Sequence, residues 1–490
     1  MLRSLVTNRG GAHAPSIFLA PMANAGGVKL ALAVAAAGGI ASLPGAAMST
    51  EDLRAGIRAV RAAGHEPIVN FFAHTVPVRR LEDDAKWLRF LRPTYEAVGL
   101  ACDARVFTPS SQEGDEEGEL AIKDFPHWFT QTAGRNPFDA ASLQLVVEEQ
   151  LSLVSFHFGL PRALPTTSSS PSLPAQTLAD VRSTFWKSIA HFFWSSAISL
   201  RDENRISGDS DNTNGNKDHH LHRISVLSTA TTPEECLHLY AAGVDGIILQ
   251  GAEAGGHRGN FLDPLTPLNH LSTLELVKLS RGIIEEHFSH ERLHTKTNAK
   301  SDDNTPALSR PLIIAAGGIA THSDVRAAIA AGADAVQVGT AFLNCEESSI
   351  PVLFRKRLVH GASIVGENVV DPTAVTTGFT GRPARGIANV VAALVPFVDQ
   401  QQVSVEGEEG SSGAPPPPQV PPFPTAVDGW NPIRKIVEAQ PQQHNQGVVD
   451  AVVDADAYTS MFCGTKVASS CFGVPRTAQS VVKMLRAEGV

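Results

Sequence analysis

Apolar residues in this chain fall into short runs that are separated by longer segments of mixed polarity. Eight of these runs have the length and composition of strands that are buried on both faces. They cover residues 16–22, 40–43, 67–72, 151–159, 223–229, 246–249, 311–319 and 335–342. Strands that alternate with helices predict a parallel sheet with right-handed crossovers. Eight such units predict an α/β fold of the (β/α)8 TIM-barrel type.

Helical spacing and end signals predict the structure of the segments between these strands. The signals are clearest over residues 232–242, where Pro233 takes the first helical position and Glu234 and Glu235 lie in the first turn. Further helices are expected over 28–37, 50–63, 81–92, 178–197, 271–288 and 324–331, with two closing helices over 458–468 and 476–488. These helices supply the crossovers that a barrel requires.

The strand-helix alternation is interrupted at several places. Residues 77–145 form an insertion with an acidic run, and residues near 161–222 and 290–310 are polar inserts that we expect on the surface. Beyond residue 345 the pattern changes to turn-rich and Pro-rich sequence. We therefore expect residues 1–76 and 146–345 to form the barrel. The insertion 77–145 and the C-terminal extension 346–490 are expected to form a helical lid domain on the substrate side.

Composition and charge narrow the classes of function. The chain has 490 residues with 43% hydrophobic content, and its 40 Lys and Arg against 50 Asp and Glu give a net charge of −10. This balance argues against a nucleic-acid partner or an anionic membrane. Five scattered cysteines without Cys-x-x-Cys spacing indicate a reducing compartment, and they argue against a disulfide framework or a metal site. We expect a cytoplasmic protein, with a mitochondrial location as the alternative.

The loop after the sixth predicted strand carries the first candidate chemistry. It contains Gln250, four glycines and His257, and it follows the C-terminal end of a strand, where parallel α/β folds place their active sites. An imidazole titrates near neutral pH, so His257 is the best candidate for a general base. His157 ends the fourth strand and would face the same mouth of the barrel, as a substrate contact or a supporting residue.

Two glycine turns late in the barrel predict a phosphate site. Gly317 and Gly318 follow the seventh strand, and Gly339 and Thr340 follow the eighth. Barrels commonly hold a phosphate between these two loops through backbone N–H groups. The alternative is that the glycines serve packing alone.

Two carboxamides at strand ends favour a flavin. Asn70 and Gln250 can each donate and accept hydrogen bonds, which suits a ring with alternating N–H and C=O groups, although each could instead cap a local turn. No G-x-G-x-x-G fingerprint follows an early strand, so FMN is favoured over NAD or FAD.

These residues together resemble a known family. The motifs are Ala20-Pro21-Met22-Ala23, Asn70-Phe71-Phe72, Gln250-Gly251-x-Glu253-Ala254-Gly255-Gly256-His257-Arg258-Gly259, Ala316-Gly317-Gly318-Ile319 and Gln337-Val338-Gly339-Thr340-Ala341-Phe342-Leu343. Their order resembles that of the nitronate monooxygenases, formerly called 2-nitropropane dioxygenases. The block from Glu253 to His257 is the most specific part of the match, because glycine turns alone occur in many flavin barrels.

The resemblance implies a set of residue roles. The place of the family's catalytic histidine is taken by His257. Tyr458, Phe462 and Lys466 resemble a Tyr-x3-Tyr-x3-Lys pattern on the substrate side, where a helix would put all three on one face and the lysine would offset an anionic nitronate. Phe462 departs from the second tyrosine of that pattern. The implied FMN contacts are Pro21, Met22, Ala23, Asn70, Gln250, Gly255, Gly318, Gln337, Gly339 and Thr340.

The resemblance implies FMN-dependent oxidation of alkyl nitronates by O2 to carbonyl compounds and nitrite, with neutral nitroalkanes as an open second substrate class. One alternative is an FMN- and NADH-dependent enoyl-thioester reductase on a similar barrel. An alternative of another class is a flavin-free phosphate-binding barrel with a binding or regulatory role. The sequence leaves the oligomeric state and the physiological nitronate open.

Overall fold

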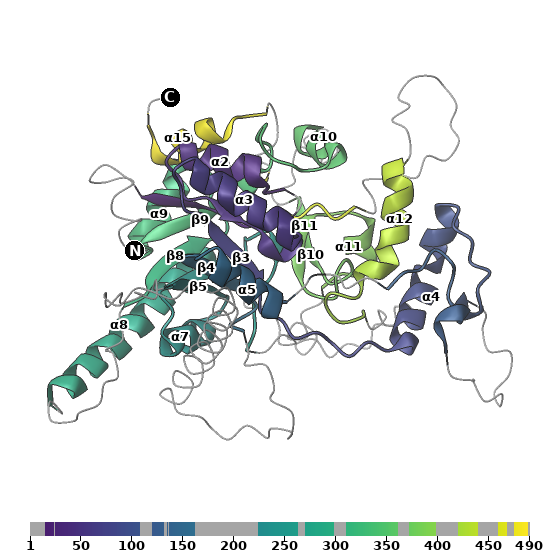
Figure 1. The fold of residues 1–490 in the computed structure, drawn as a ribbon, viewed down its shortest axis with the longest axis horizontal. Helices are drawn as coiled ribbons and strands as arrows, with labels where there is room; N and C mark the ends of the chain where they lie inside the picture. The colour runs from purple at the N-terminus through teal and green to yellow at the C-terminus, as the bar shows by residue number, and fades with distance from the viewer. Residues whose placement is uncertain are drawn as a thin grey trace, which may run out of the picture.

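The structure is a computed structural model, and its described residues are 15–23, 25–107, 120–131, 135, 137–161, 224–262, 270–297, 310–360, 372–397, 420–439, 459–467 and 475–488. Figure 1 shows a strand-rich body with the helices α4 and α12 on its right-hand side. The helix expected over 178–197, most of the insert near 161–222 and Tyr458 lie outside the described residues.

Eight parallel strands form the centre of the structure. They are β1 (Ser16–Leu19), β2 (Ser42–Leu43), β3 (Ile68–Phe72), β4 (Leu153–His157), β5 (Ser225–Ala230), β6 (Gly246–Gln250), β8 (Leu312–Ala316) and β9 (Ala335–Val338). Their order is β1-β9-β8-β6-β5-β4-β3-β2. A parallel bridge between Phe18 and Ile40, just before β2, joins the two ends of the sheet. All eight predicted strands are confirmed, and the sheet closes as a barrel.

Burial on both faces explains why these strands appear as continuous apolar runs. One buried cluster contains Phe18, Ile68, Leu227, Ile248 and Ile314, which come from different strands. The neighbouring residues along the same strands, such as Ile17 and Ile313, belong to a second and larger cluster that includes the helices. Alternate side chains thus point to the two faces, as the pleat requires.

Seven helices of the described part of the chain belong to the barrel. They are α2 (Val28–Ala36), α3 (Thr50–Ala62), α5 (Ala140–Glu148), α7 (Pro233–Ala242), α8 (Thr273–Thr297), α9 (His322–Ala330) and α15 (Ala478–Arg486). Ser49, Thr232 and Thr321 cap α3, α7 and α9, each accepting a hydrogen bond from a backbone N–H in the first turn. Such caps satisfy the free N–H groups at a helix start. They confirm the helix starts that were expected at residues 50 and 232.

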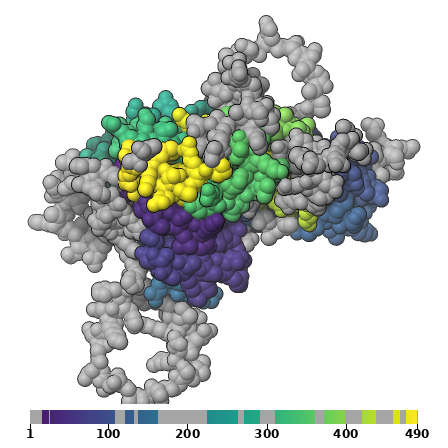
Figure 2. All heavy atoms as spheres, turned by 90° about the horizontal axis from the view of Figure 1, so that it is seen from above, coloured from purple at the N-terminus to yellow at the C-terminus, as the bar shows by residue number. Residues whose placement is uncertain are grey.

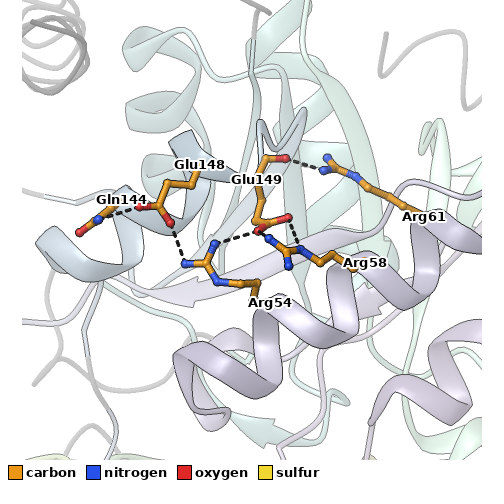
Figure 3. A network of polar contacts seen from close by, with 6 residues as sticks. All are labelled: Arg54, Arg58, Arg61, Gln144, Glu148 and Glu149. Atoms are coloured by element: carbon orange, nitrogen blue, oxygen red, sulfur yellow. Dashed lines mark hydrogen bonds and ion pairs between the residues drawn. The ribbon is translucent and has the colours of Figure 1, made fainter. Parts of the chain in front are cut away.

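An ion-pair network fixes the point where the insertion returns to the barrel (Figure 3). Arg54 and Arg58 on α3 bond the Glu149 carboxylate at 2.8 and 2.7 Å, and Arg54 also pairs with Glu148 at 2.7 Å. Arg61, one turn further along α3, donates to the backbone carbonyl of Glu149. Because Glu149 lies just before β4, the network holds α5 against α3 and fixes the start of that strand.

The insertion and the C-terminal extension share a second hydrophobic core. It packs Trp87 and Leu91 of α4 (Leu81–Ala97) against Trp430 and Ile433 of α12 (Val427–Ala439). The Trp87 indole donates to the Ala426 carbonyl at 3.1 Å, and the Tyr95 hydroxyl donates to the Gly429 carbonyl at 2.8 Å. Below we call this unit the lid. The lid also contains the short helix α11 (Val390–Leu394), and α10 (Val352–His360) lies beside it.

A small antiparallel sheet joins the lid to the barrel. Its strands are β10 (Thr373–Thr376), β11 (Ala384–Ile387) and β7 (Gly256–His257), in the order β10-β11-β7. Because β7 belongs to the loop after β6, the predicted base His257 lies in a sheet whose other two strands come from the C-terminal extension. No pattern in the sequence predicts this sheet.

Two expectations for the C-terminal extension are wrong. Helix α15 contacts α2 and α9 on the outside of the barrel, so it does not belong to the lid. Figure 2 shows the C-terminal residues in yellow against the N-terminal ones in purple. Residues 459–466 are not helical. The backbone of this segment instead pairs with β11: Ile387 N–H donates to Met461 O and Cys463 N–H donates to Arg385 O.

Candidate active site

A cavity of about 590 Å³ lies between the barrel and the lid, where the barrel strands end. Every predicted site residue that the structure describes lines it, which brings together positions spread from residue 21 to residue 466. They are Pro21, Met22, Ala23, Asn70, His157, Gln250, Gly255, His257, Gly318, Gln337, Gly339, Thr340, Phe462 and Lys466.

Backbone contacts from both sides hold His257 in place. On the barrel side its carbonyl oxygen accepts hydrogen bonds from Gln250 Nε2 at 2.9 Å and from His157 Nε2 at 3.2 Å. On the lid side, β7 pairs with β11, and the next N–H, that of Arg258, donates to Pro383 O at 2.9 Å. The histidine therefore sits at the junction of the two units.

Gln250 and His157 support this loop. The Gln250 Oε1 atom accepts from the Gly259 N–H at 2.8 Å, so both ends of its amide are bonded to the loop that carries His257. His157 bonds Thr229 Oγ1 through Nδ1 at 3.2 Å. Since a carbonyl oxygen can only accept, the His157 hydrogen is on Nε2, toward the carbonyl of His257. Burial and the charge of Arg382 lower the pKa of His157 to about 3, so its ring is neutral.

Aromatic rings surround the His257 imidazole. The rings of Phe423 and Phe462 lie 5.2 and 5.3 Å from it, and those of Phe158 and Phe72 lie at 6.1 and 6.4 Å. Burial lowers the pKa of His257 well below its usual value, and the positive charges of Arg135 and Arg382 lower it further. The ring is therefore neutral at physiological pH and has a lone pair with which to accept a proton.

The two glycine turns also line the cavity. Gly317 and Gly318 have φ angles of +112° and +64°, which favour glycine and turn the backbone after β8. Gly464 N–H donates to Thr340 Oγ1 at 2.8 Å, which brings the C-terminal segment against the turn after β9. The N-terminus of α9 follows the first of these turns, as at phosphate sites of other barrels.

Lys466 lies beside the helix that follows the first glycine turn, which differs from the sequence-based expectation. Its ammonium group is 3.6 Å from Asp324 Oδ1, and Asp324 caps the start of α9. The predicted helical face shared by Phe462 and Lys466 does not exist, because this segment pairs with β11. Phe462 contacts His257, whereas Lys466 lies beside α9.

Sequence reasoning missed several residues of this cavity. Phe423, Thr380, Arg135 and Arg434 all line it from the lid. They lie in segments without strand or helix periodicity, or on a helix that was not predicted, so no local pattern marked them. Phe72 also lines the cavity; it belongs to the recognised motif Asn70-Phe71-Phe72, but no role was predicted for it.

Comparisons with known proteins agree with the motifs. The family model of nitronate monooxygenases matches residues 206–404. The nitronate monooxygenase of Paraburkholderia phytofirmans is 30% identical to this chain over 379 residues, which are 77% of this chain and 75% of that protein. The chain belongs to the nitronate monooxygenase family.

Other relatives of the family agree with this assignment. The nitronate monooxygenase of Pseudomonas aeruginosa is 29% identical over 376 residues, 76% of each chain. The solved structure of a nitroalkane oxidase from Streptomyces ansochromogenes aligns with a TM-score of 0.59 at 22% identity, covering 99% of this chain and 97% of that one. That likeness supports the barrel fold. None of the described helices is both long and apolar enough to cross a membrane.

Proposed function

We propose that this protein uses FMN to oxidise alkyl nitronates with O2, giving a carbonyl compound and nitrite. The observation that carries the proposal is the cavity itself. Its lining combines a neutral histidine among aromatic rings with two glycine turns, the first of which precedes a helix N-terminus. Membership of the nitronate monooxygenase family supports the same activity.

The residues present fit FMN. The turns at Gly318 and Gly339 would hold the phosphate through backbone N–H groups, with Lys466 supplying a positive charge nearby. Asn70, which is 4% exposed, donates to Ser155 Oγ at 3.0 Å, while its Oδ1 makes no hydrogen bond within the described part of the chain. That oxygen would accept from a ring N–H. When bound, FMN supplies the electron acceptor for the nitronate and the electron donor for O2.

The charges that line the cavity favour an anionic substrate. Among the described residues, Arg135, Arg434 and Lys466 line it, against one carboxylate, that of Glu253. Glu253 Oε2 accepts from the backbone N–H and the hydroxyl of Thr273, both at 2.9 Å, so this carboxylate is held at the barrel wall. A positive cavity in a chain of net charge −10 concentrates anions at the site. A nitronate is such an anion.

In this site His257 would remove the carbon-bound proton of a neutral nitroalkane, and it would orient a nitronate that has already lost that proton. The surrounding phenylalanines would exclude water from the reacting carbon. Gln250 and His157 hold the backbone of the base, so their role is to position it.

Two substrate forms test this function. We expect the purified protein to show flavin absorbance and to lose it when ethyl nitronate is added without oxygen. His257→Asn should lose at least about a hundredfold in kcat/KM for nitroethane, the usual contribution of a general base, and far less for ethyl nitronate.

Other outcomes would favour the alternatives. A colourless protein that takes up no FMN would favour a flavin-free binding barrel. Stoichiometric consumption of NADH with an enoyl thioester would favour the reductase. Equal losses on both substrates in His257→Asn would leave His257 as a positioning residue.

A further inference from the structure

A threonine from the lid contacts the candidate base directly. Thr380 lies in the connection between β10 and β11, and its Oγ1 is 3.0 Å from Nε2 of His257. Both side chains line the cavity. This is the one hydrogen bond that the His257 ring makes within the described part of the chain, so it decides how the ring is protonated.

The hydrogens can be assigned from the partners of the Thr380 hydroxyl. Thr380 Oγ1 also lies 3.4 Å from the carbonyl oxygen of Arg382, which can only accept. A hydroxyl has a single hydrogen, and if that hydrogen points to the carbonyl, the oxygen can only accept from His257. Nε2 of His257 then carries the hydrogen, and Nδ1 has the free lone pair.

The surroundings of the ring favour the same arrangement. Nδ1 of His257 makes no hydrogen bond to the described residues, so a hydrogen on Nδ1 would have no acceptor in this part of the chain. A lone pair on Nδ1 is more favourable than a hydrogen there, because Arg135 and Arg382 already make the site positive. His74 and His157 are neutral and add no charge. The bond from Nε2 to Thr380 also persists after Nδ1 accepts a proton, since both nitrogens of the cationic ring donate.

We propose that Thr380 is a positioning residue that holds His257 in the tautomer with hydrogen on Nε2 and leaves Nδ1 as the nitrogen that accepts the substrate proton. The proposal rests on the proposed function, because only proton abstraction from a neutral nitroalkane requires this tautomer. In this arrangement the lid contributes to proton abstraction, because Thr380 comes from the lid and His257 comes from the loop after β6 of the barrel.

Three variants test the role of Thr380. Thr380→Val keeps the shape but removes the hydroxyl, and Thr380→Ser restores it. Thr377→Val is the matched control, because Thr377 lies in the same turn and its side chain does not line the cavity. In protein labelled with ¹⁵N-histidine and carrying its cofactor, NMR should show the His257 hydrogen on Nε2 in the wild type, with the signal assigned by its loss in His257→Asn. In Thr380→Val the two tautomers should mix.

Kinetics supply the second measurement. Thr380→Val should lose about tenfold in kcat/KM for nitroethane, the order expected for one hydrogen bond, while ethyl nitronate stays within about twofold. Thr380→Ser should recover most of the loss, and Thr377→Val should match the wild type on both substrates.

Several results would overturn the proposal. They are a wild-type hydrogen on Nδ1, equal losses on both substrates in Thr380→Val, no recovery in Thr380→Ser, or a wild type that does not turn over nitroethane. Failure of the proposed function looks different, because protein that carries FMN but is not reduced by ethyl nitronate would still give the tautomer by NMR, and protein that takes up no FMN would fail before this experiment.

Discussion

Acid should destabilise this protein through a buried histidine, His74. The side chain is 8% exposed, and neither ring nitrogen has a partner with hydrogen-bond geometry within the described residues. Its ring packs against Phe423 at 4.9 Å and against Phe72 and Phe158 at 6.1 Å. Burial and the charge of Arg382 lower its pKa from 6.5 to about 4, with a small opposing contribution from the Arg135 backbone.

The sign and size of the effect follow from this pKa. A histidine whose pKa is lowered by folding stays neutral in the folded protein and gains a proton in the unfolded chain as the pH falls below 6.5. The stability is therefore complete above pH 6.5 and is lost as the pH falls toward 4. Between pH 7 and pH 5 the unfolded ring becomes almost fully protonated while the folded ring does not. This difference costs about 2 kcal/mol of unfolding free energy.

Replacing His74 with phenylalanine isolates this contribution. The new ring would fit among three other phenylalanines and cannot take up a proton. We expect the unfolding free energy of His74→Phe to fall between pH 7 and pH 5 by about 2 kcal/mol less than that of the wild type. Urea unfolding followed by tryptophan fluorescence measures this, because Trp87 and Trp430 are buried in the lid core.

Two outcomes check the reasoning. His127→Gln is the control, because His127 is exposed on the lid and its removal should leave the pH dependence unchanged. If His74→Phe kept the full wild-type dependence, His74 would not be the neutral buried group that the structure indicates. His157, with a pKa of about 3, should continue to contribute in both proteins, so the difference between them is the quantity that matters.

Two further predictions concern the charges of the cavity. Lys466→Met should weaken FMN binding about fivefold or more while leaving riboflavin binding and the KM for ethyl nitronate nearly unchanged, as titration of the apoprotein and steady-state kinetics would show. A raised KM for ethyl nitronate with unchanged FMN affinity would instead indicate that Lys466 contacts the substrate. Arg434→Gln should raise the KM for ethyl nitronate severalfold and reduce the salt dependence of kcat/KM. Lys435→Gln, the adjacent exposed cation that does not line the cavity, should change neither, and equal effects of the two variants would rule out a specific role for Arg434.

The barrel could be predicted from the sequence because each strand is buried on both faces. Strands such as Gly246–Gln250 and Leu312–Ala316 are fully buried. They can be recognised as apolar runs without knowing which face of the strand each residue is on. The motifs after these strands gave the barrel side of the cavity for the same reason: a residue at the C-terminal end of a parallel strand faces the mouth of the barrel. Gln250 and Gly318 are examples, whereas Asn70, which was expected at a strand end, lies in the middle of β3.

The lid side of the cavity could not be found in this way. Thr380 is 123 residues from His257 along the chain and lies in a turn whose position depends on the pairing of β11 with β7. Lys466 was misplaced for a related reason, since a four-residue spacing suggested a helix where the chain pairs with β11 over residues 461–463 and then turns at 465–466. Local periodicity indicates which face of a helix or strand is buried. It does not predict the conformation of a segment that is fixed by contacts with residues far away in the sequence.

The core that α4 shares with α12 has a consequence for how the protein is made. Trp87 and its hydrogen-bond partner Ala426 are separated by 339 residues. The ribosome therefore synthesises α4 long before it synthesises α12. Until then the apolar face of α4, with Trp87, Leu88 and Leu91, has no partner from the C-terminal half. Contacts between such distant residues form slowly, and exposed apolar faces invite aggregation while they wait. The nascent chain should therefore need chaperone protection for most of its synthesis, and its cavity is completed only when the last segments arrive.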